Sequence, residues 1–116
     1  MKILYVAGKY RSKEGTRGVW ENIERAGDVA VQLWRMGFAV ICPHKNTAFF
    51  DGPDDAEMFI NGDLEMIKRC DGVVALPGWK ESVGARQEIG YSKERWIPVY
   101  FWPKDKEKLV KLGKLK

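Results

Sequence analysis

The sequence predicts an α/β protein, a three-layer αβα sandwich with a doubly wound parallel sheet of four to five strands, flavodoxin-like or Rossmann-like in architecture. Short apolar runs alternate with segments of helical periodicity, and a glycine or proline follows each run. Right-handed crossovers then place helices on both faces of the sheet. The 116 residues suffice for one domain. We expect that domain over residues 1–103 and a Lys-rich tail over residues 104–116.

The first half of the chain contains two strands and one helix in this interpretation. Residues 2–7 form a compact apolar run that ends at Gly8, as a buried strand would. Apolar residues then recur at three- and four-residue steps, which indicates an amphipathic helix with its apolar face in the core, ended by Gly37. They are Trp20, Ile23, Ala26, Ala30, Leu33 and Trp34. Residues 38–42 form the second strand, and a long loop over residues 43–54 follows.

The second half repeats this alternation. Residues 55–70 are predicted to be helical, although the Asn61-Gly62 pair weakens the middle of that helix. Residues 72–76 form the third strand, residues 82–95 the third helix and residues 97–102 the fourth strand.

The formal net charge of +4 lies in the tail. Residues 104–116 contain six Lys and two acidic residues, whereas residues 1–103 contain 14 basic and 14 acidic residues. A basic protein can bind nucleic acid, but the body of this domain is neutral, so we do not expect a nucleic-acid partner. Leu109, Leu112 and Leu115 recur at three-residue steps, which fits a helical tail, and a disordered tail is the alternative.

Cysteine and histidine are scarce. Two Cys and one His exclude a disulfide framework and a four-ligand Cys/His zinc site, and we expect neither a metal nor another cofactor. Cys42 and Cys70 are interpreted as small core residues. No run approaches 18 apolar residues, and the N-terminal run is too short for a signal peptide. We therefore expect a cytoplasmic protein without membrane association.

Three loops meet at the carboxyl edge of the predicted sheet, where doubly wound proteins bind ligands. In the first loop, Gly8 permits close approach of a ligand to the backbone, and Arg11 is suited to binding an anion. An ordinary turn glycine and a solvated arginine are the alternative. In the second loop, His44 follows the second strand, with a structural role as its alternative.

The third loop carries the most chemistry. Ser82 is a natural N-cap, and Gly84 lets a ligand approach the free N–H groups of the first helical turn. Glu88 lies on the helix face of Gly84, so it can face a ligand, although a solvated carboxylate is the alternative. Trp79 is a candidate for stacking on a base. Asp63, on the preceding helix, is by itself equally well a cap or turn residue.

Five short motifs together resemble the nucleoside 2-deoxyribosyltransferase superfamily, most closely the branch of 2'-deoxynucleoside 5'-phosphate N-hydrolases and its small relatives. The resemblance covers residues 3–102. The motifs are Leu4-Tyr5-Val6-Ala7-Gly8 with Arg11, Asp63-Leu64-Glu65, Asp71-Gly72-Val73-Val74-Ala75, Ser82-Val83-Gly84 and Glu88-Ile89-Gly90. In one place the chain departs from the pattern, because Arg86 stands where the hydrolase branch has a further glycine.

The resemblance implies a role for each matching residue. Glu88 would be the nucleophile that attacks the anomeric carbon, Tyr5 would hydrogen-bond its carboxylate, and Asp63 would hold the nucleophile or sugar and help proton transfer. Ser82 would bind a 5'-phosphate, together with Arg11. The resemblance also implies a nucleoside or nucleotide substrate and a homodimer or higher homo-oligomer.

Several functions remain open at this point. Water or a second base can resolve the glycosyl ester, so both a hydrolase and a transferase are possible. A nucleotide-binding sensor without turnover is the main alternative. A ribonucleotide phosphoribohydrolase is another, since Pro77-Gly78, Gly84 and Glu88 loosely match its Pro-Gly-Gly-x-Gly-Thr-x-x-Glu loop. A nucleic-acid accessory protein that uses the basic tail is the last.

Overall fold

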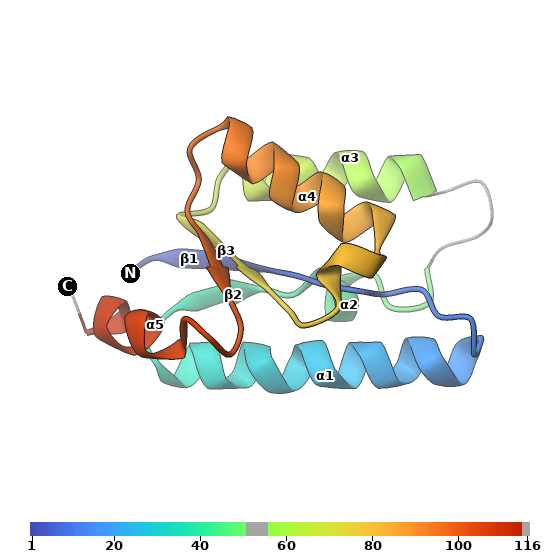
Figure 1. Cartoon of the computed structure of the whole chain (residues 1–116), viewed down its shortest axis with the longest axis horizontal. Helices are drawn as coiled ribbons and strands as arrows, with labels where there is room; N and C mark the ends of the chain where they lie inside the picture. The colour runs from blue at the N-terminus through green and yellow to red at the C-terminus, as the bar shows by residue number, and fades with distance from the viewer. Residues whose placement is uncertain (51–55, 115–116) are drawn as a thin grey trace.

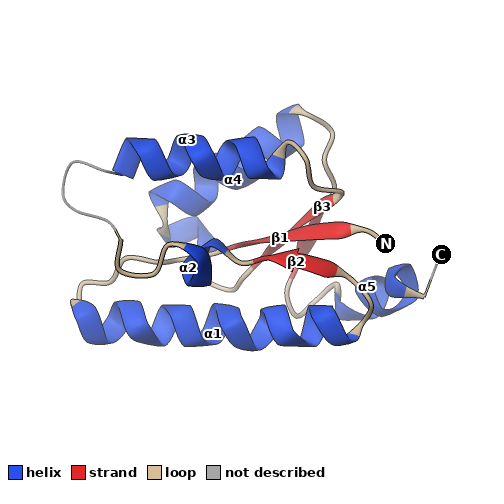
Figure 2. Cartoon of the chain, turned by 180° about the vertical axis from the view of Figure 1, so that it is seen from behind, coloured by secondary structure: helices blue, strands red, loops and turns tan. Residues whose placement is uncertain are grey.

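A computed structural model of the chain describes residues 1–50 and 56–114 (Figure 1). Residues 51–55 and 115–116, which include the Gly52-Pro53 pair and Leu115 of the sequence predictions, lie outside the described residues. The described part forms three layers, with a parallel sheet between two layers of helices (Figures 1 and 2). The predicted three-layer α/β fold is therefore confirmed.

Four strands form the sheet of the described part. They are β1 (Ile3–Ala7), β2 (Ala39–Ile41), β3 (Gly72–Ala75) and β4 (Val99–Phe101). Their order is β2-β1-β3-β4, and all neighbours are parallel. Because β1 is central and pairs on both sides, the chain reverses its winding direction there. The carboxyl ends of β1 and its two neighbours consequently meet at one edge.

Alternate side chains of β1 point to opposite helical layers. Leu4 and Val6 pack in one buried cluster with α1 (Thr16–Arg35) and α5 (Lys106–Gly113). Tyr5 belongs to the other cluster, which includes residues of α3 (Ala56–Ile67) and α4 (Val83–Glu94). This alternation places Tyr5 on the side where α3 and α4 lie together (Figure 1).

Two short helices occupy the carboxyl edge of the sheet. The segment predicted as a loop contains α2 (Pro43–Asn46), which begins with proline at a position where its missing N–H costs nothing. A 3-10 turn, η1 (Trp79–Glu81), leads into α4. Both bring side chains to the edge where ligands bind in such folds.

Helix α1 corrects one prediction. It begins at Thr16, earlier than its apolar periodicity indicates, and its buried face is made of small and branched side chains such as Ala26 and Leu33. Trp20 and Trp34 were predicted to be core residues, but they are 55% and 53% exposed, so this prediction is wrong. Cys70 is buried, whereas Cys42 is only half-buried.

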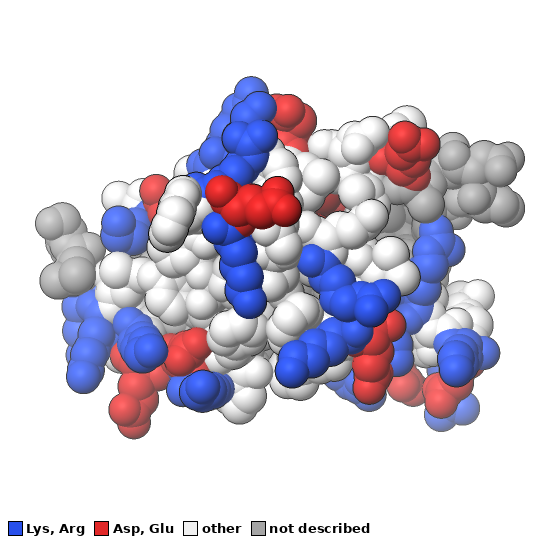
Figure 3. Space-filling view, turned by 45° about the horizontal axis from the view of Figure 1, so that its top comes forward, with Lys and Arg blue, Asp and Glu red and all other residues white. Residues whose placement is uncertain are grey.

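The tail is helical and packs against the domain. Leu109 of α5 is fully buried in the cluster that contains Leu4 and Leu33. A Cβ on Gly113 would lie 2.2 Å from the carbonyl oxygen of Met36, so the end of α5 approaches α1 closely. On the face shown in Figure 3, basic and acidic side chains are interspersed rather than gathered by sign. No helix within residues 1–50 and 56–114 is long and apolar enough to cross a bilayer.

Replacing Leu109 with alanine should destabilise the whole domain, because it leaves a cavity in the main core. We expect a loss of about 2–5 kcal/mol in the free energy of unfolding, measured by denaturant titration. The exposed Lys111→Ala change on the same helix serves as control and should cost less than about 0.5 kcal/mol. Equal effects of the two changes would show that α5 is not part of the cooperative core.

Candidate active site

The centre of the site is a hydrogen bond between the sheet and a helix. Ser82 caps α4, its Oγ accepting from the Ala85 N–H at 3.2 Å, and Glu88 follows in the second turn. The Tyr5 hydroxyl, on β1, donates to Oε2 of Glu88. Tyr5 is fully buried and Glu88 is 6% exposed. The structure therefore holds Glu88 as a buried carboxyl group in the middle of α4 and not as a solvated one.

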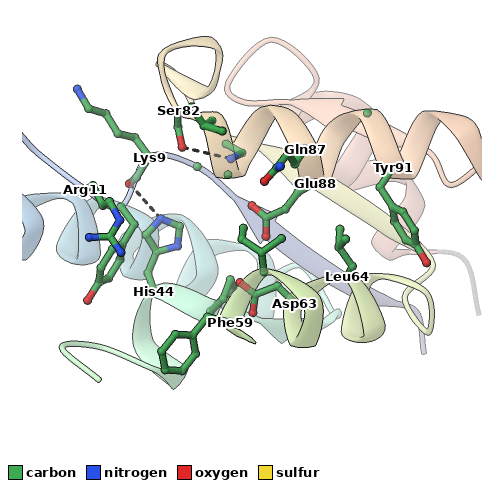
Figure 4. Close-up of a pocket in the computed structure, with 18 of the residues that line it drawn as sticks. Lys9, Arg11, His44, Phe59, Asp63, Leu64, Ser82, Gln87, Glu88 and Tyr91 are labelled. Carbon is green, nitrogen blue, oxygen red and sulfur yellow. Dashed lines mark hydrogen bonds between the residues drawn. The ribbon is translucent and has the colours of Figure 1, made fainter. Parts of the chain in front are cut away.

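Asp63 reaches the same place from α3. It is half-buried and lines one pocket with Glu88 (Figure 4). Burial raises the pKa of Asp63 to about 6, against the opposing effect of a hydrogen bond with Tyr5. Tyr5 thus interacts with both carboxyl groups. The three residues to which the family resemblance gives catalytic roles lie together.

The pKa of Glu88 is raised further, to about 8. Burial is the main cause, the Tyr5 hydrogen bond opposes it, and the negative charge of Asp63 adds to it. Burial and the two carboxylates also raise the pKa of Tyr5 well above its ordinary value, so its hydroxyl keeps its proton. The carboxyl pair therefore holds one proton between about pH 6 and pH 8.

A pocket of about 1090 Å³ opens over these groups at the carboxyl edge of the sheet. Its walls come from the loop after β1, from α2, from α3 and from the segment between η1 and the end of α4 (Figure 4). Sequence-predicted residues in the lining are Gly8, Arg11, His44, Asp63, Ser82, Gly84 and Glu88. Their convergence agrees with the expected position of the ligand site.

Two of these residues also have structural roles. A Cβ on Gly8 would lie 2.7 Å from Cδ1 of Leu76, so a larger residue after β1 would displace the Leu76 side chain that follows β3. His44 is 4% exposed, and its Nε2 donates to the carbonyl oxygen of Lys9 at 3.1 Å. Its Nδ1 is buried without a hydrogen-bond partner among the residues that the structure describes. Burial lowers the pKa of His44, which keeps the ring neutral. His44 thereby ties the loop after β1 to α2.

Trp79 lies elsewhere. Its ring packs on Phe101, with the centroids 5.9 Å apart, and it lines a separate hollow of about 350 Å³ at the ends of β3 and β4. The structure therefore does not bring Trp79 together with Glu88. Arg86 is exposed and is not among the pocket-lining residues, because it lies on the outer side of α4.

Several other residues that line the pocket were not singled out in the sequence analysis. Lys9 directly follows Gly8 in the first loop, so the argument that selected Arg11 applies to it equally. Phe59, Gln87 and Tyr91 carry no such signal, since ordinary helical residues face the pocket only through the packing of α3 against α4.

Comparisons with known proteins give a family and a fold. A family model described as Domain of unknown function (DUF4406) matches residues 2–101, which is most of the chain. No curated protein sequence matches at a significant level. The structure resembles a 2-deoxyribosyltransferase from Bacillus psychrosaccharolyticus, with a TM-score of 0.64 and 20% identity, over 85% of this chain and 70% of that one.

Two further structures are similar. A conserved protein from Enterococcus faecalis V583 has a TM-score of 0.69 and 23% identity, over 99% of this chain and 76% of that one. The CMP N-glycosidase of Clostridium botulinum has a TM-score of 0.52 and 20% identity, over 96% of this chain and 98% of that one. At these identities the comparisons establish the fold, and the expected nucleoside 2-deoxyribosyltransferase-like fold is confirmed.

The buried carboxyl group should make stability depend on pH. The pKa of Glu88 is higher in the folded than in the unfolded chain. Its contribution to the free energy of unfolding is therefore fully present below about pH 4.5 and is lost as pH rises towards 8. Glu88→Gln removes this loss. The free energy of unfolding of the variant should gain on that of the unchanged protein by roughly 1 kcal/mol per pH unit in this range.

Thermal unfolding from pH 4.5 to pH 8.5 measures the effect as a widening difference in Tm. Glu107→Gln, which replaces an exposed carboxyl on α5, serves as control and should leave the pH dependence unchanged. A constant difference between Glu88→Gln and the unchanged protein across this range would contradict the raised pKa.

Proposed function

This chain belongs to the family described as Domain of unknown function (DUF4406), and from its site we propose that it cleaves the N-glycosidic bond of a 2'-deoxynucleoside or of its 5'-monophosphate. Glu88 is the nucleophile in this proposal, and the bond is either hydrolysed or exchanged for one to another base. The observation that carries the proposal is the buried Tyr5–Glu88 hydrogen bond, with Asp63 beside it, beneath a pocket large enough for a nucleotide.

The chemistry uses two carboxyl groups in different states. In the first step a carboxylate oxygen of Glu88 bonds to C1' while the bond from C1' to the base nitrogen breaks, and its electron pair leaves with the base. Asp63, in its acid form, gives the base its proton. The negative charge of Glu88 stabilises the oxocarbenium-like transition state. Water or a second base then attacks C1', the ester bond from C1' to Glu88 breaks, and the proton of the attacking group passes to the Asp63 carboxylate, so both groups return to their first state.

Tyr5 positions the nucleophile in this scheme. Its hydroxyl donates a hydrogen bond to Oε2 of Glu88, so Oε1 is the oxygen that attacks C1' in this proposal. Ser82, Gly84 and Arg11 lie along the same pocket, where they would receive the 5' end of the substrate at the start of α4. His44 holds the loop that carries Arg11, and Trp79 has no part because it lies outside the pocket.

The fold comparisons support this reaction type. One similar structure is named a 2-deoxyribosyltransferase and another a CMP N-glycosidase, and both names describe chemistry at the glycosidic carbon of a nucleoside or nucleotide. Because CMP contains ribose, the substrates tested should include ribonucleotides beside deoxyribonucleotides.

One observation favours a second candidate, a nucleotide-binding sensor without turnover. With a pKa of about 8, Glu88 is mostly protonated at neutral pH in the free protein and donates hydrogen bonds better than it attacks carbon. A sensor predicts that ligand binding, followed as a rise in Tm, persists in Glu88→Gln while no substrate is consumed.

Release of free base is the direct test. We expect the purified protein to liberate base from at least one deoxynucleoside or deoxynucleoside 5'-monophosphate, detected by chromatography. Glu88→Gln should reduce the rate by at least about 10³-fold and Tyr5→Phe by about 10-fold, since the phenol only positions the nucleophile. Glu107→Gln is the control. If no nucleoside or nucleotide, with or without an added acceptor base, releases its base, the enzymatic proposal fails.

The pH dependence of kcat/KM should be bell-shaped. The reaction needs a carboxyl pair that holds one proton, and this state exists between the two pKa values of about 6 and about 8. The rate should fall below pH 6 because Glu88 and Asp63 are both protonated, and above pH 8 because both are ionised. In Asp63→Asn the alkaline fall should disappear. A rate that is level from pH 5 to pH 9 would exclude this pair as the acid and nucleophile.

A further inference from the structure

We propose that Lys9 selects substrates that carry a 5'-phosphate, and that Glu81 weakens this selection by holding the Lys9 ammonium at the rim of the pocket. The inference rests on the proposed function and names a choice that this function leaves open, between phosphorylated and free nucleosides. Neither residue takes part in the reaction itself.

The carbonyl group of Lys9 has a buried hydrogen-bond partner, whereas its side chain is largely exposed. His44, which is almost fully buried, donates to the Lys9 carbonyl oxygen at 3.1 Å. The ammonium lies 3.6 Å from Oε2 of Glu81, and the two side chains are 41% and 71% exposed. In Figure 4 the Lys9 side chain extends outward, away from Glu88 and Asp63. In this proposal the Lys9 ammonium can exchange its contact with Glu81 for a contact with a ligand.

Glu81 is the residue directly before the cap of α4. It ends η1, and its N–H donates to the carbonyl oxygen of Gly78 at 3.0 Å. Glu81 therefore directly precedes the helix start at which a phosphate would bind, and it lines the same pocket as Ser82. A negative charge in this place attracts Lys9 and repels a phosphate at the same time.

The charges of the pocket make Lys9 important. Among the described residues that line it, two are basic, Lys9 and Arg11, and five are acidic. The acidic residues are Glu57, Asp63, Glu81, Glu88 and Glu94. A phosphate with nearly two negative charges enters such a pocket favourably only where cations meet it. Each of the two basic residues consequently has a large effect on the preference for a phosphorylated ligand.

A phosphate can displace Glu81 because the ion pair is exposed. Exposed pairs contribute little to stability, and a phosphate offers Lys9 a larger charge and several acceptor oxygens. Binding would therefore exchange the Glu81 contact for a contact with the substrate. Without Glu81, the ammonium is available to the phosphate from the beginning, so affinity for phosphorylated substrates should rise.

The test compares Lys9→Gln, Glu81→Gln and the double variant on one deoxynucleoside and its 5'-monophosphate. The readout is the ratio of kcat/KM for the monophosphate to kcat/KM for the nucleoside. We expect Lys9→Gln to lower this ratio at least 10-fold, mainly through KM, and Glu81→Gln to raise it several-fold. The double variant should equal Lys9→Gln, because Glu81 acts through Lys9.

Lys80→Gln is the matched control. It removes the same charge from the residue next to Glu81, but the Lys80 ammonium lies over the Trp79 ring, 5.8 Å from its centroid, and outside this pocket. The ratio should stay within about twofold. An unchanged ratio in Lys9→Gln, an unchanged or lower ratio in Glu81→Gln, or a rise that persists in the double variant would overturn the proposal.

Calorimetric titration separates this proposal from the proposed function. If the unchanged protein releases no base, the same ratio is taken from dissociation constants for the two compounds. A preference for the monophosphate that Lys9→Gln abolishes then supports Lys9 as the selecting residue, although the enzymatic function has failed. Binding of neither compound overturns both.

Discussion

The site depends on one hydrogen bond, which the Tyr5 hydroxyl donates to Glu88 between the central strand and α4. A buried carboxyl group needs such a partner, because it has lost most of its hydration. β1 pairs on both sides, so Tyr5 stands on an internal strand of the sheet. Ser82 caps α4 and sets where its second turn begins, which brings Glu88 over Tyr5. Strand pairing and helix capping together therefore determine the position of the carboxyl group.

Burial has an electrostatic consequence that suits the proposed chemistry. Glu88 and Asp63 lie in surroundings that disfavour two charges, so the pair retains a proton through the neutral range. One carboxylate and one carboxylic acid are what cleavage of a glycosidic bond requires. In the proposed reaction the substrate would favour the ionised form of Glu88 and the acid form of Asp63, because positive charge develops on the sugar next to Glu88. The raised pKa values that burial causes in the free protein therefore suit the proposed pair of acid and nucleophile.

In the part of the pocket near Lys9, main-chain contacts shape the loop after β1. His44 fixes the Lys9 carbonyl, and Gly8 allows the chain to pass Leu76 closely. These contacts hold the main chain of the loop after β1, while the ammonium of Lys9 stays exposed and paired with Glu81. In our proposal the main chain of this loop shapes the pocket, and the exposed Lys9 ammonium responds to the charge of the ligand.

Local patterns in the chain account for the apolar runs that form strands, for the cap at Ser82 and for the motifs around Tyr5, Asp63 and Glu88. Each of these features needs only neighbouring residues. They do not account for which carboxyl groups are buried, since Glu88 and a solvated helix glutamate look alike until α4 packs on the sheet. The same holds for Trp20 and Trp34, which helical periodicity places on the apolar face in the core but which packing leaves exposed. The basic tail showed a possible helix in its leucine spacing. Its docking follows from the fit of Leu109 into the core and of Gly113 against Met36, contacts between residues far apart in the chain.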